Sequence, residues 1–305
     1  EEKDAAFLKL YDGHDWKWFA VRLKHTDMEY LRKHWSGKKA SAPMLEKKHD
    51  KYFLRFTYAE EVALNRTPVK EQTICSVDLG INTDAVCTIM RPDGTILGRK
   101  FINFPSDKDR MYRVLGRIRR FQREHGSRQV QGRWAYAKRL NTELGKKIAR
   151  EIVFYASENR ADVIVFEYLE MKGKLSGKKK QKLQMWRKRD IQKRCGQQAH
   201  RKGIRISRIC AWNTSRLAFD GSGKIDRDIQ DHRLCTFQNG KRYNCDLSAS
   251  YNIGARYFIR EILKPLPATE RSLLEAKVPA VKRRTSCVYA DLRDLISEME
   301  LRKAA

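Results

Sequence analysis

The order of strand-like and helix-like segments after residue 72 restricts the fold of this chain more than any other sequence feature. Three short apolar runs come first, at 73–78, 85–90 and 95–101, and an Arg-Pro-Asp-Gly turn joins the second run to the third. These runs predict three antiparallel strands. Two further strands are expected near 163–166 and 204–209, and long amphipathic helices separate them. The order predicts an α/β domain of the ribonuclease H-like (RuvC) class with helical insertions.

The helical patterns complete this domain and extend beyond it. Helices are expected at about 107–124, 134–159, 180–202, 246–263, 268–277 and 289–302. We therefore predict an α/β nuclease-type domain over 71–263 and a helical C-terminal extension over 264–305. Residues 210–245 interrupt the domain with polar, glycine-containing and weakly patterned sequence, which predicts a long functional loop.

Residues 1–70 have a different pattern. Aromatic, partly alternating runs at 16–25 and 51–60 predict strands, and a short helical pattern lies between them. Two strands and a short helix do not close a β module. We therefore predict a partial β-rich module. Since the chain also begins with Glu1 rather than Met, we expect it to be the C-terminal part of a longer protein.

The charge of the chain indicates its class of partner. The sequence has 65 Lys and Arg against 37 Asp and Glu, a formal net charge of +28, and the excess is concentrated at 108–150 and 171–208. An excess of this size favours a polyanion, so a nucleic acid is expected. The residues expected to bind it are Arg117, Arg120, Arg133, Lys138, Arg139, Lys179, Lys180, Trp186, Arg187, Arg189, Arg205 and Arg216.

The expected surroundings of the chain are those of the cell interior. The sequence has no apolar run of about 18 residues and no secretory leader, so no membrane contact is expected. Its seven cysteines are scattered without Cys-x-x-Cys spacing, which favours a reducing compartment.

Three acidic residues are predicted to meet at one edge of the sheet. Asp78 ends the first strand, Glu167 ends the fourth, and Asp246 opens the helix after the fifth. In this fold the first and fourth strands are neighbours. Carboxylates that gather without a basic partner repel one another, which is tolerated mainly where they share divalent cations. We therefore predict that these three catalytic residues hold two Mg²⁺ or Mn²⁺ ions.

Each acid also has a purely structural interpretation. Asp78 is a candidate turn residue, and Asp246 a candidate helix N-cap. Glu167 gains nothing as a cap, and an unpaired buried charge is costly. The three acids in combination, within a basic chain, favour the catalytic interpretation. Asp84, Asp93 and Asp162 lie at loops or element starts and are predicted to be turn residues.

The same residues carry a family resemblance. The segments SVDLGINTDAVCTI, VIVFEYLE and CDLSASYNIGARY resemble the three RuvC motifs of the transposon-encoded TnpB nucleases and of type V CRISPR effectors. The resemblance covers about residues 50–263. It implies RNA-guided cleavage of DNA, with Asp78, Glu167 and Asp246 as the catalytic acids. It also implies a guide RNA, a target DNA as heteroduplex and single strand, and a prokaryotic cytoplasm.

The resemblance also interprets the N-terminal module and the missing part of the protein. The run Lys51 to Glu60 resembles the last part of the family's wedge domain, which grips guide RNA. Residues 1–70 would then be a wedge remainder, and the missing N-terminal recognition and wedge part would be a partner of this chain.

The insertion departs from the family pattern. The family commonly has a four-cysteine zinc ribbon here, beginning after a Thr-Ser pair, but Thr214-Ser215 is followed by no nearby cysteine. Gln238 stands where the partner of Cys235 would be. A structural zinc needs four Cys or His ligands, so no zinc is expected and the segment is interpreted as a metal-free loop. Whether Cys210, His232, Cys235 and Cys245 form another metal set is left open.

Two other functions remain open on the sequence alone. One is a catalytically silent protein that binds guide RNA and DNA and acts by occupancy. The other is an unguided RuvC-type resolvase or transposase. Bound RNA would separate the second from a guided nuclease, and cleavage in Mg²⁺ would separate the first.

Overall fold

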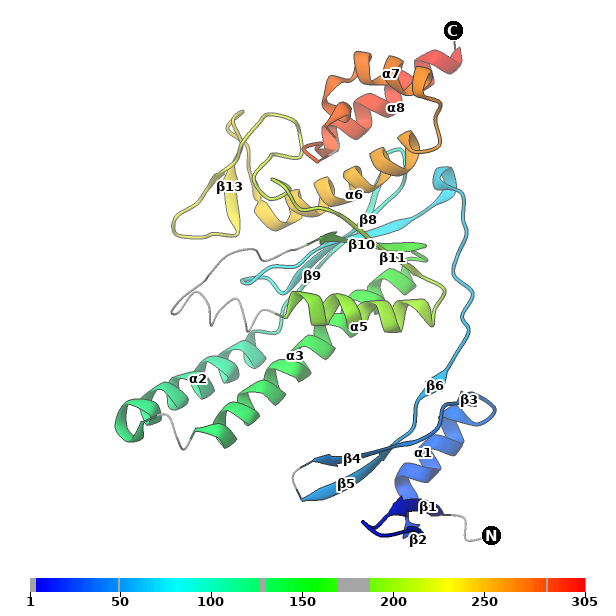
Figure 1. Ribbon diagram of the computed structural model, residues 1–305. Coiled ribbons are helices and arrows are strands. Elements are labelled where there is room, and N and C mark those ends of the chain that lie inside the picture. The colour runs from blue at the N-terminus through cyan, green and yellow to red at the C-terminus, as the bar shows by residue number, and fades with distance from the viewer. Residues whose placement is uncertain (1–3, 49, 127–129, 169–186, 284, 305) are drawn as a thin grey trace. The chain divides into compact units, whose positions relative to one another are not determined.

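The computed structural model describes residues 4–48, 50–126, 130–168, 187–283 and 285–304 (Figure 1). Its contacts divide the chain into two compact units, Glu1–Val62 and Ala63–Ala305. Within the described ranges, no helix is both long enough and apolar enough to cross a membrane.

The unit Glu1–Val62 consists of three small two-stranded sheets and one helix. Its elements are β1 (Ala5–Tyr11) with β2 (Trp16–Arg22), α1 (His25–Trp35), β3 (Lys39–Ala40) with β6 (Tyr58–Ala59), and β4 (Met44–Lys48) with β5 (Lys51–Arg55). The strand predictions at 16–25 and 51–60 correspond to β2 and β5, whereas β1 and β4 were not predicted. No described residue of this unit is buried.

The unit Ala63–Ala305 is built on a five-stranded mixed sheet. Its first half contains η1 (Val69–Glu71), β7 (Ile74–Asp78), β8 (Ala85–Met90), β9 (Ile96–Ile102), α2 (Pro105–His125), α3 (Gln131–Glu158) and β10 (Val163–Tyr168). Its second half contains α5 (Lys188–His200), β11 (Arg205–Cys210), β12 (Asp226–Arg227), β13 (Leu234–Thr236), β14 (Arg242–Asn244), α6 (Cys245–Leu263), α7 (Ala268–Lys277), η2 (Pro279–Lys282) and α8 (Tyr289–Ala304).

The strand order of the main sheet is β11-β10-β7-β8-β9. β7, β8 and β9 form the predicted antiparallel meander, and β10 runs parallel to both β7 and β11. The prediction that the first and fourth strands are neighbours is thus confirmed. Parallel strands end at the same edge, so the carboxyl ends of β7 and β10 meet.

A hydrophobic core covers each face of this sheet. Alternate residues of a strand point to opposite faces. On one face Ile74 and Val163 pack with α6 and the C-terminal helices, and on the other Cys75 and Ile164 pack with α3 and α5 (Figure 1). The inner strands β7, β8 and β10 are therefore buried on both sides.

Helix α6 lies unusually close to the sheet. A Cβ atom at Gly254 would lie 2.8 Å from Met90 Cε and 3.1 Å from Ser76 Oγ, so a side chain there would require the Met90 side chain to move. The other side of α6 packs on α8. Consequently α6 is buried over most of its length, which fixes the position of its first turn.

The expected loop at 210–245 is in part a small sheet. β12, β13 and β14 pair antiparallel in the order β12-β13-β14. They enclose a core of Ala218, Cys235, Phe237 and Cys245, against which Phe219 and Tyr243 pack. The prediction of a loop was wrong here because these aromatic residues meet only in three dimensions and leave no periodic pattern.

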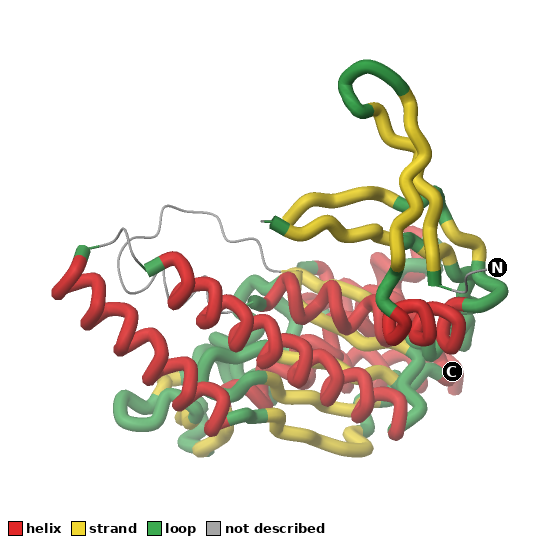
Figure 2. Tube along the Cα trace, turned by 90° about the horizontal axis from the view of Figure 1, so that it is seen from below, coloured by secondary structure: helices red, strands yellow, loops and turns green. Residues whose placement is uncertain are grey.

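Helices α2 and α3 form an antiparallel pair beside the sheet (Figures 1 and 2). The C-terminal half of α3, around Ile148 and Ile152, covers the sheet. Its N-terminal half packs on α2 through a separate cluster around Met111, Ile118 and Ala137. α3 begins a few residues earlier than the predicted residue 134. The first residues predicted for the basic helix, 180–186, lie outside the described residues.

Candidate active site

Asp78 and Glu167 face the same side of the sheet at the same edge. Asp78 is two and four residues from Ser76 and Ile74, which face α6, and Glu167 is two residues from Val165, which also faces α6. The parallel register pairs Phe166 with Val77, so the next pair along the two strands is Glu167 with Asp78. Neighbouring strands are about 4.8 Å apart, so the two carboxylates are near neighbours. Both are 7% exposed.

Asp246 reaches this edge from the first turn of α6. The helix begins at Cys245, one residue earlier than predicted, and Asn244 is its N-cap, accepting a hydrogen bond from Leu247 N at 2.9 Å. The cap is therefore already made, and the Asp246 carboxylate is not needed for it. A Cβ atom at Gly80 would lie 3.5 Å from Asp246 Oδ2, which places this carboxylate next to the turn that follows β7.

The turn after β7 explains the Asp-x-Gly spacing. A Cβ atom at residue 80 would lie only 2.3 Å from the backbone carbonyl oxygen of Thr83, a contact that no side chain could make. Gly80 therefore lets the chain fold back tightly. The Thr83 hydroxyl donates a hydrogen bond to Asp246. The first motif thus carries one acid and supports another.

The three carboxylates are electrostatically strained as a group. Burial, then the charges of Glu167 and Asp246, raise the pKa of Asp78 well above its usual range. Burial also raises the pKa of Glu167 and of Asp246. Raised carboxylate pKa values in an otherwise basic chain are the signature predicted for a shared cation site.

One basic side chain, Lys188, acts directly on the two strand-end acids. Gln192, one helical turn further along α5, donates a hydrogen bond to the Glu167 carbonyl at 2.9 Å, which brings the start of α5 to the end of β10. The Lys188 charge opposes the rise in pKa of both Asp78 and Glu167. Burial lowers the pKa of Lys188 to about 8, and the two acids oppose that change. Sequence reasoning missed this residue, because α5 approaches β10 only in the fold.

A network of buried polar groups fixes the position of Glu167. The Thr214 hydroxyl donates a hydrogen bond to Glu167 Oε1. The Asn252 side chain donates to the carbonyl oxygens of Thr214 and Leu217, both at 3.0 Å, and accepts from Tyr289 N at 3.0 Å. Asn252, from the third motif, therefore positions Thr214, and Thr214 in turn positions Glu167.

Arg256 reinforces the same network one turn later on α6. It is 2% exposed and donates to the carbonyl oxygens of Cys210, Trp212 and Cys287 at 2.9, 2.7 and 2.7 Å. Its charge also lowers the pKa of Glu167. This role of Arg256 was not predicted, because a buried arginine can be identified only from the residues that surround it in the fold.

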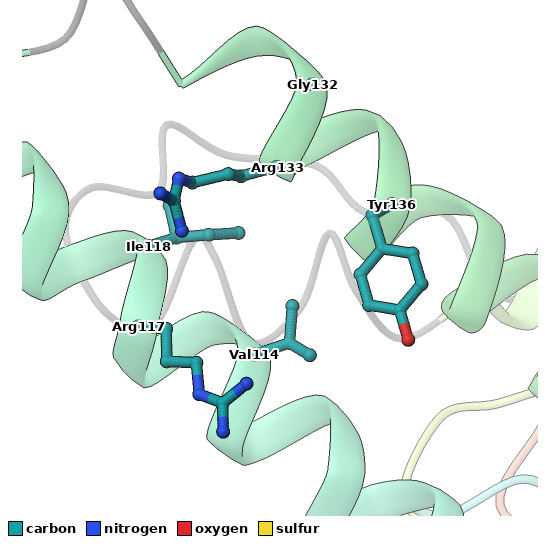
Figure 3. A pocket seen from close by; sticks show the side chains of 6 residues that line it. All are labelled: Val114, Arg117, Ile118, Gly132, Arg133 and Tyr136. Atoms are coloured by element: carbon teal, nitrogen blue, oxygen red, sulfur yellow. The ribbon is translucent and has the colours of Figure 1, made fainter.

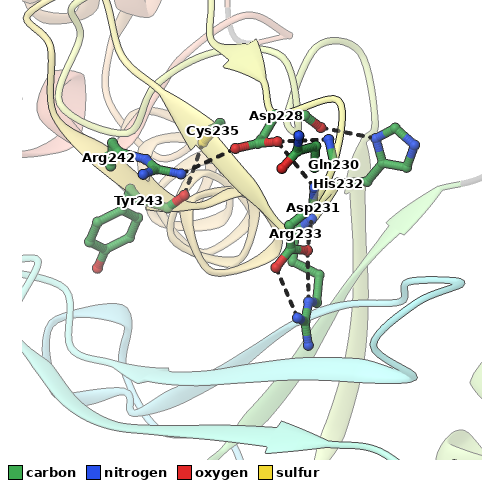
Figure 4. Close-up of polar contacts among 8 residues, drawn as sticks. All are labelled: Asp228, Gln230, Asp231, His232, Arg233, Cys235, Arg242 and Tyr243. Carbon is green, nitrogen blue, oxygen red and sulfur yellow. Dashed lines mark hydrogen bonds and ion pairs between the residues drawn. The ribbon is translucent and has the colours of Figure 1, made fainter.

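The insertion supplies two further cations to Asp246. The charges of Arg227 and Arg233 oppose the rise in its pKa. Their loop is built on Asp228, which accepts hydrogen bonds from the backbone of Gln230 and Asp231 and from Arg242 (Figure 4). Arg233 is held by Asp231 at 2.8 Å. The small sheet therefore brings positive charge to the third acid.

The donor set suits a hard divalent cation, although it is not assembled around one. Three carboxylates with raised pKa values offer the oxygen ligands that Mg²⁺ and Mn²⁺ prefer. As the described residues stand, however, no group of three His, Cys, Asp or Glu side chains is arranged to hold a metal ion. Binding would require the carboxylates to draw closer.

Asp84, Asp93 and Asp162 were predicted to be turn residues, and of these three only Asp93 bonds within its own turn, whereas Asp84 and Asp162 join segments distant in sequence. Asp162 accepts hydrogen bonds from Thr67 Oγ1 and Thr73 N at 2.5 and 3.0 Å. Asp93 accepts from Thr95 N at 2.9 Å in the turn between β8 and β9. Asp84 accepts from Phe104 N at 2.8 Å.

The predicted nucleic-acid residues fall into three groups. Arg117, Arg120, Arg133, Lys138 and Arg139 are exposed on α2 and α3. The second group lies next to residues that act on the acids. Arg187 and Arg189 flank Lys188 in the chain, and Arg216 is two residues after Thr214. Lys179, Lys180 and Trp186 lie outside the described residues.

Arg205 is not near the acids. It opens β11 opposite Val163, at the end of the sheet remote from Glu167, and its Nε and Nη2 atoms are buried. The strand direction explains this distance, because Arg205 begins its strand whereas the acids end theirs. Its binding to nucleic acid stays a prediction.

Cys210, His232, Cys235 and Cys245 were considered as a metal set, but among the described residues no three of them form a group that could hold a metal ion. Cys210 is exposed at the end of β11, and the His232 ring bonds the Asp228 carbonyl at 3.1 Å. Cys235 and Cys245 are buried and hydrogen-bond to each other. Cys235 Sγ also donates to the Tyr243 carbonyl at 3.4 Å (Figure 4).

Comparison with known proteins finds structural neighbours only. No protein-family model and no curated protein sequence matches the chain. It resembles Cas12f1 in its complex with sgRNA and target DNA, at 18% identity over 68% of this chain and 54% of that one, with a TM-score of 0.49. It also resembles Cas12i in its complex with crRNA and double-stranded DNA, at 12% identity over 90% of this chain and 44% of that one, with a TM-score of 0.42.

A third neighbour belongs to the same group. It is the AacC2c1–sgRNA binary complex, at 9% identity over 84% of this chain and 48% of that one, with a TM-score of 0.46. These neighbours are type V CRISPR effectors, the group that the three sequence motifs resemble. The chain spans about half the length of the solved proteins that it matches.

Proposed function

We propose that this chain carries the RuvC nuclease site of an RNA-guided DNA endonuclease of the TnpB and type V kind, on a ribonuclease H-like fold. The observation that carries the proposal is the gathering of Asp78, Glu167 and Asp246 on one face and one edge of the sheet. Three separate motifs meet there although 168 positions separate the outer two. The raised pKa values of the three buried acids support the same assignment, because perturbed pKa values cluster at functional sites.

The strand order supports the ribonuclease H-like assignment. It places β10 beside β7, with a three-stranded antiparallel meander on one side and a parallel pair on the other. That is the arrangement expected when three strands are followed by alternating helices and strands. Asp78 and Glu167 fall at the carboxyl ends of the adjacent strands β7 and β10, where α/β proteins place their sites, and Asp246 joins them from the first turn of α6.

Asp78, Glu167 and Asp246 would hold the divalent cations. When bound, two such ions would supply activation of a water molecule and stabilisation of the leaving oxygen in phosphodiester hydrolysis. Thr214 keeps the Glu167 carboxylate oriented, and Thr83 does so for Asp246. Lys188 keeps positive charge beside the acids.

The polyanionic substrate would lie along the basic surfaces. Arg187, Arg189 and Arg216 come from segments next to the acids, and the arginines of α2 and α3 extend the charge away from the sheet. Guide RNA and target DNA are the proposed partners, held by salt-sensitive phosphate contacts.

A cleavage assay tests this function. The purified chain, with the RNA that co-purifies with it, should cut DNA that matches this RNA in Mg²⁺ and stop in EDTA. Asp78→Ala should reduce cleavage to the background of the EDTA control. Asp93→Ala removes an acid of the same domain that only makes a turn, so it should cleave as the parent does. Equal cleavage by Asp78→Ala and the parent would refute the assignment.

A silent binder is the second candidate, and one observation favours it. The described acids are not arranged to hold a metal ion as they stand. A binder would retain RNA and DNA in EDTA and leave DNA intact in Mg²⁺ or Mn²⁺ for both the parent and the Asp78→Ala variant. Cleavage by the parent alone excludes this candidate.

A further inference from the structure

A small hollow lies between α2 and α3, on the part of the helix pair that does not cover the sheet. Its volume is about 270 Å³. It is lined by Val114, Arg117, Ile118, Gly132, Arg133 and Tyr136 (Figure 3). The core cluster around Ile118 and Ala137 forms its support, so the hollow belongs to a packed helix pair.

The lining combines apolar and cationic groups. Val114 and Ile118 of α2 present methyl groups, while Arg117 and Arg133 come from opposite helices and carry the two guanidinium groups (Figure 3). The Tyr136 ring adds an aromatic wall. Gly132 leaves this part open, because a Cβ atom placed there would have no atom within 4 Å.

Guanidinium groups already lie close to aromatic rings around the hollow. The Arg133 guanidinium is 4.2 Å from the centre of the Phe121 ring. Arg110 donates a hydrogen bond to Tyr136 Oη at 2.6 Å, and Arg139 is 5.9 Å from the centre of the same ring. Flat cations and rings in this arrangement are the groups on which nucleobases stack.

The charge at the rim is free to act on a ligand. Within the described ranges, Arg117, Arg120, Arg133, Lys138 and Arg139 form no ion pair with a carboxylate. Lysines of the same helices are paired, as Lys146 is with Glu143 and Lys147 is with Asp107, both at 2.7 Å. Two of these residues, Arg117 and Arg133, line the hollow, whereas the paired Lys146 and Lys147 do not.

We propose that this hollow receives one unstacked nucleobase of a single-stranded nucleic acid, while Arg117 and Arg133 hold the neighbouring phosphates. The volume is below the roughly 300–1,000 Å³ typical of sites for drug-sized molecules, and a single base is a flat fragment of suitable size. A duplex keeps its bases stacked inside the helix and could not fill the hollow. The site thus selects single strands, and this selection does not depend on the cleavage chemistry.

Filling the hollow tests the proposal without removing charge. Gly132→Leu puts a side chain into the open space, and a non-glycine residue also suits a helix. Gly116→Leu is the matched control, because Gly116 is also helical with no atom within 4 Å of an added Cβ, but it does not line the hollow. Circular dichroism should show equal helix content in the parent and both variants.

The first measurement is the affinity for a labelled thymidine oligonucleotide of about 6 nucleotides, by fluorescence anisotropy in EDTA. Gly132→Leu should weaken binding by about tenfold, within the range known for stacking of one base, and leave the salt dependence unchanged. Gly116→Leu should bind as the parent does. Arg117→Gln should weaken binding and reduce the slope of log K against log salt by about 0.7, as expected for one lost phosphate contact.

The second measurement reports the base itself. An oligonucleotide with one internal 2-aminopurine should change fluorescence when the parent binds it, and this change should disappear in Gly132→Leu but persist in Gly116→Leu. Equal affinity of Gly132→Leu and the parent for the single strand would overturn the proposal. So would an equal loss for a duplex of the same length, or the same loss in Gly116→Leu. Because EDTA prevents cleavage, none of these outcomes depends on the nuclease function.

Discussion

The two units of this chain treat their apolar residues in opposite ways. In Ala63–Ala305, two clusters of fully buried residues cover the faces of one sheet. In Glu1–Val62, no described residue is buried, and Trp16 and Trp18 are 58% and 66% exposed. The apolar core of the larger unit stabilises its fold. This unit can therefore keep buried carboxylates that repel one another. The smaller unit has aromatic surface but no core of its own, which is typical of a segment that is completed by a partner.

The largest expected effect on stability comes from truncating a buried side chain in the α6 core. Phe258→Ala removes a ring that is 0% exposed, so we expect the free energy of unfolding to fall by about 3–5 kcal/mol. Phe19→Ala, at a ring that is 42% exposed in the smaller unit, is the matched control and should change it by less than about 1 kcal/mol. Urea unfolding followed by circular dichroism measures both. Similar losses in the two variants would abolish the contrast between the units.

A somewhat smaller loss is expected at a buried polar residue. Asn252→Ala leaves the carbonyl oxygens of Thr214 and Leu217 and the Tyr289 amide without this partner, so stability should fall by about 2–3 kcal/mol. Cleavage should also fall, because Thr214 would no longer hold Glu167 in place. Asn239→Ala, whose amide bonds Asp220 on the exposed surface, is the control. Unchanged stability of Asn252→Ala would show that water replaces the lost bonds.

A gain is expected when one strained acid is neutralised. Burial, Glu167 and Asp246 raise the pKa of Asp78 above 3.8, so the folded protein binds more protons than the unfolded chain above about pH 4. The free energy of unfolding therefore falls as the pH rises through this window. In EDTA near pH 8, Asp78→Asn should raise Tm by about 2–4 °C, which corresponds to about 1 kcal/mol.

The pH dependence provides the check on this gain. The difference in Tm between Asp78→Asn and the parent should shrink as the pH falls toward and below 4, because only below its unfolded pKa of 3.8 is Asp78 mostly protonated in both the folded and unfolded states. Scanning calorimetry at several pH values measures it. A variant less stable than the parent near pH 8 would mean that the Asp78 charge is stabilised in the fold, contrary to its environment.

The smallest effect is expected on the exposed aromatic surface. Trp18→Ala should change the free energy of unfolding by no more than about 0.5 kcal/mol, because the ring has little to pack against. It should, however, reduce the binding of a hydrophobic dye such as ANS. Chemical denaturation and dye fluorescence measure the two. A loss of several kcal/mol would mean that the smaller unit has a core of its own.

The sequence predicted the parts of the site that depend on strand order and strand ends. Asp78 and Glu167 could be placed together because both end apolar runs of adjacent strands. Lys188, Thr214 and Arg256 could not be placed, since they reach the acids from segments far apart in sequence. Asn244 was not predicted to be the cap of α6, because Asp246, two residues later, is an equally good capping residue.

Errors elsewhere had equally local causes. The sheet of β12, β13 and β14 rests on contacts among Phe219, Phe237 and Tyr243, which have no periodic spacing. Composition located the basic regions of the chain, but it did not predict the contacts that build this small sheet.

The alternation that turns Asp78 and Glu167 toward α6 also limits how this protein can change in length. Deleting one residue within β7 or β10 would send the carboxylate to the opposite core, among the apolar residues that pack against α3 and α5. Deleting two residues would keep the carboxylate on the α6 side of the sheet but move it away from the edge where the acids meet. Insertions and deletions should therefore be excluded from these two strands and accumulate in the loops, so natural length variation alone could mark the acids' strands.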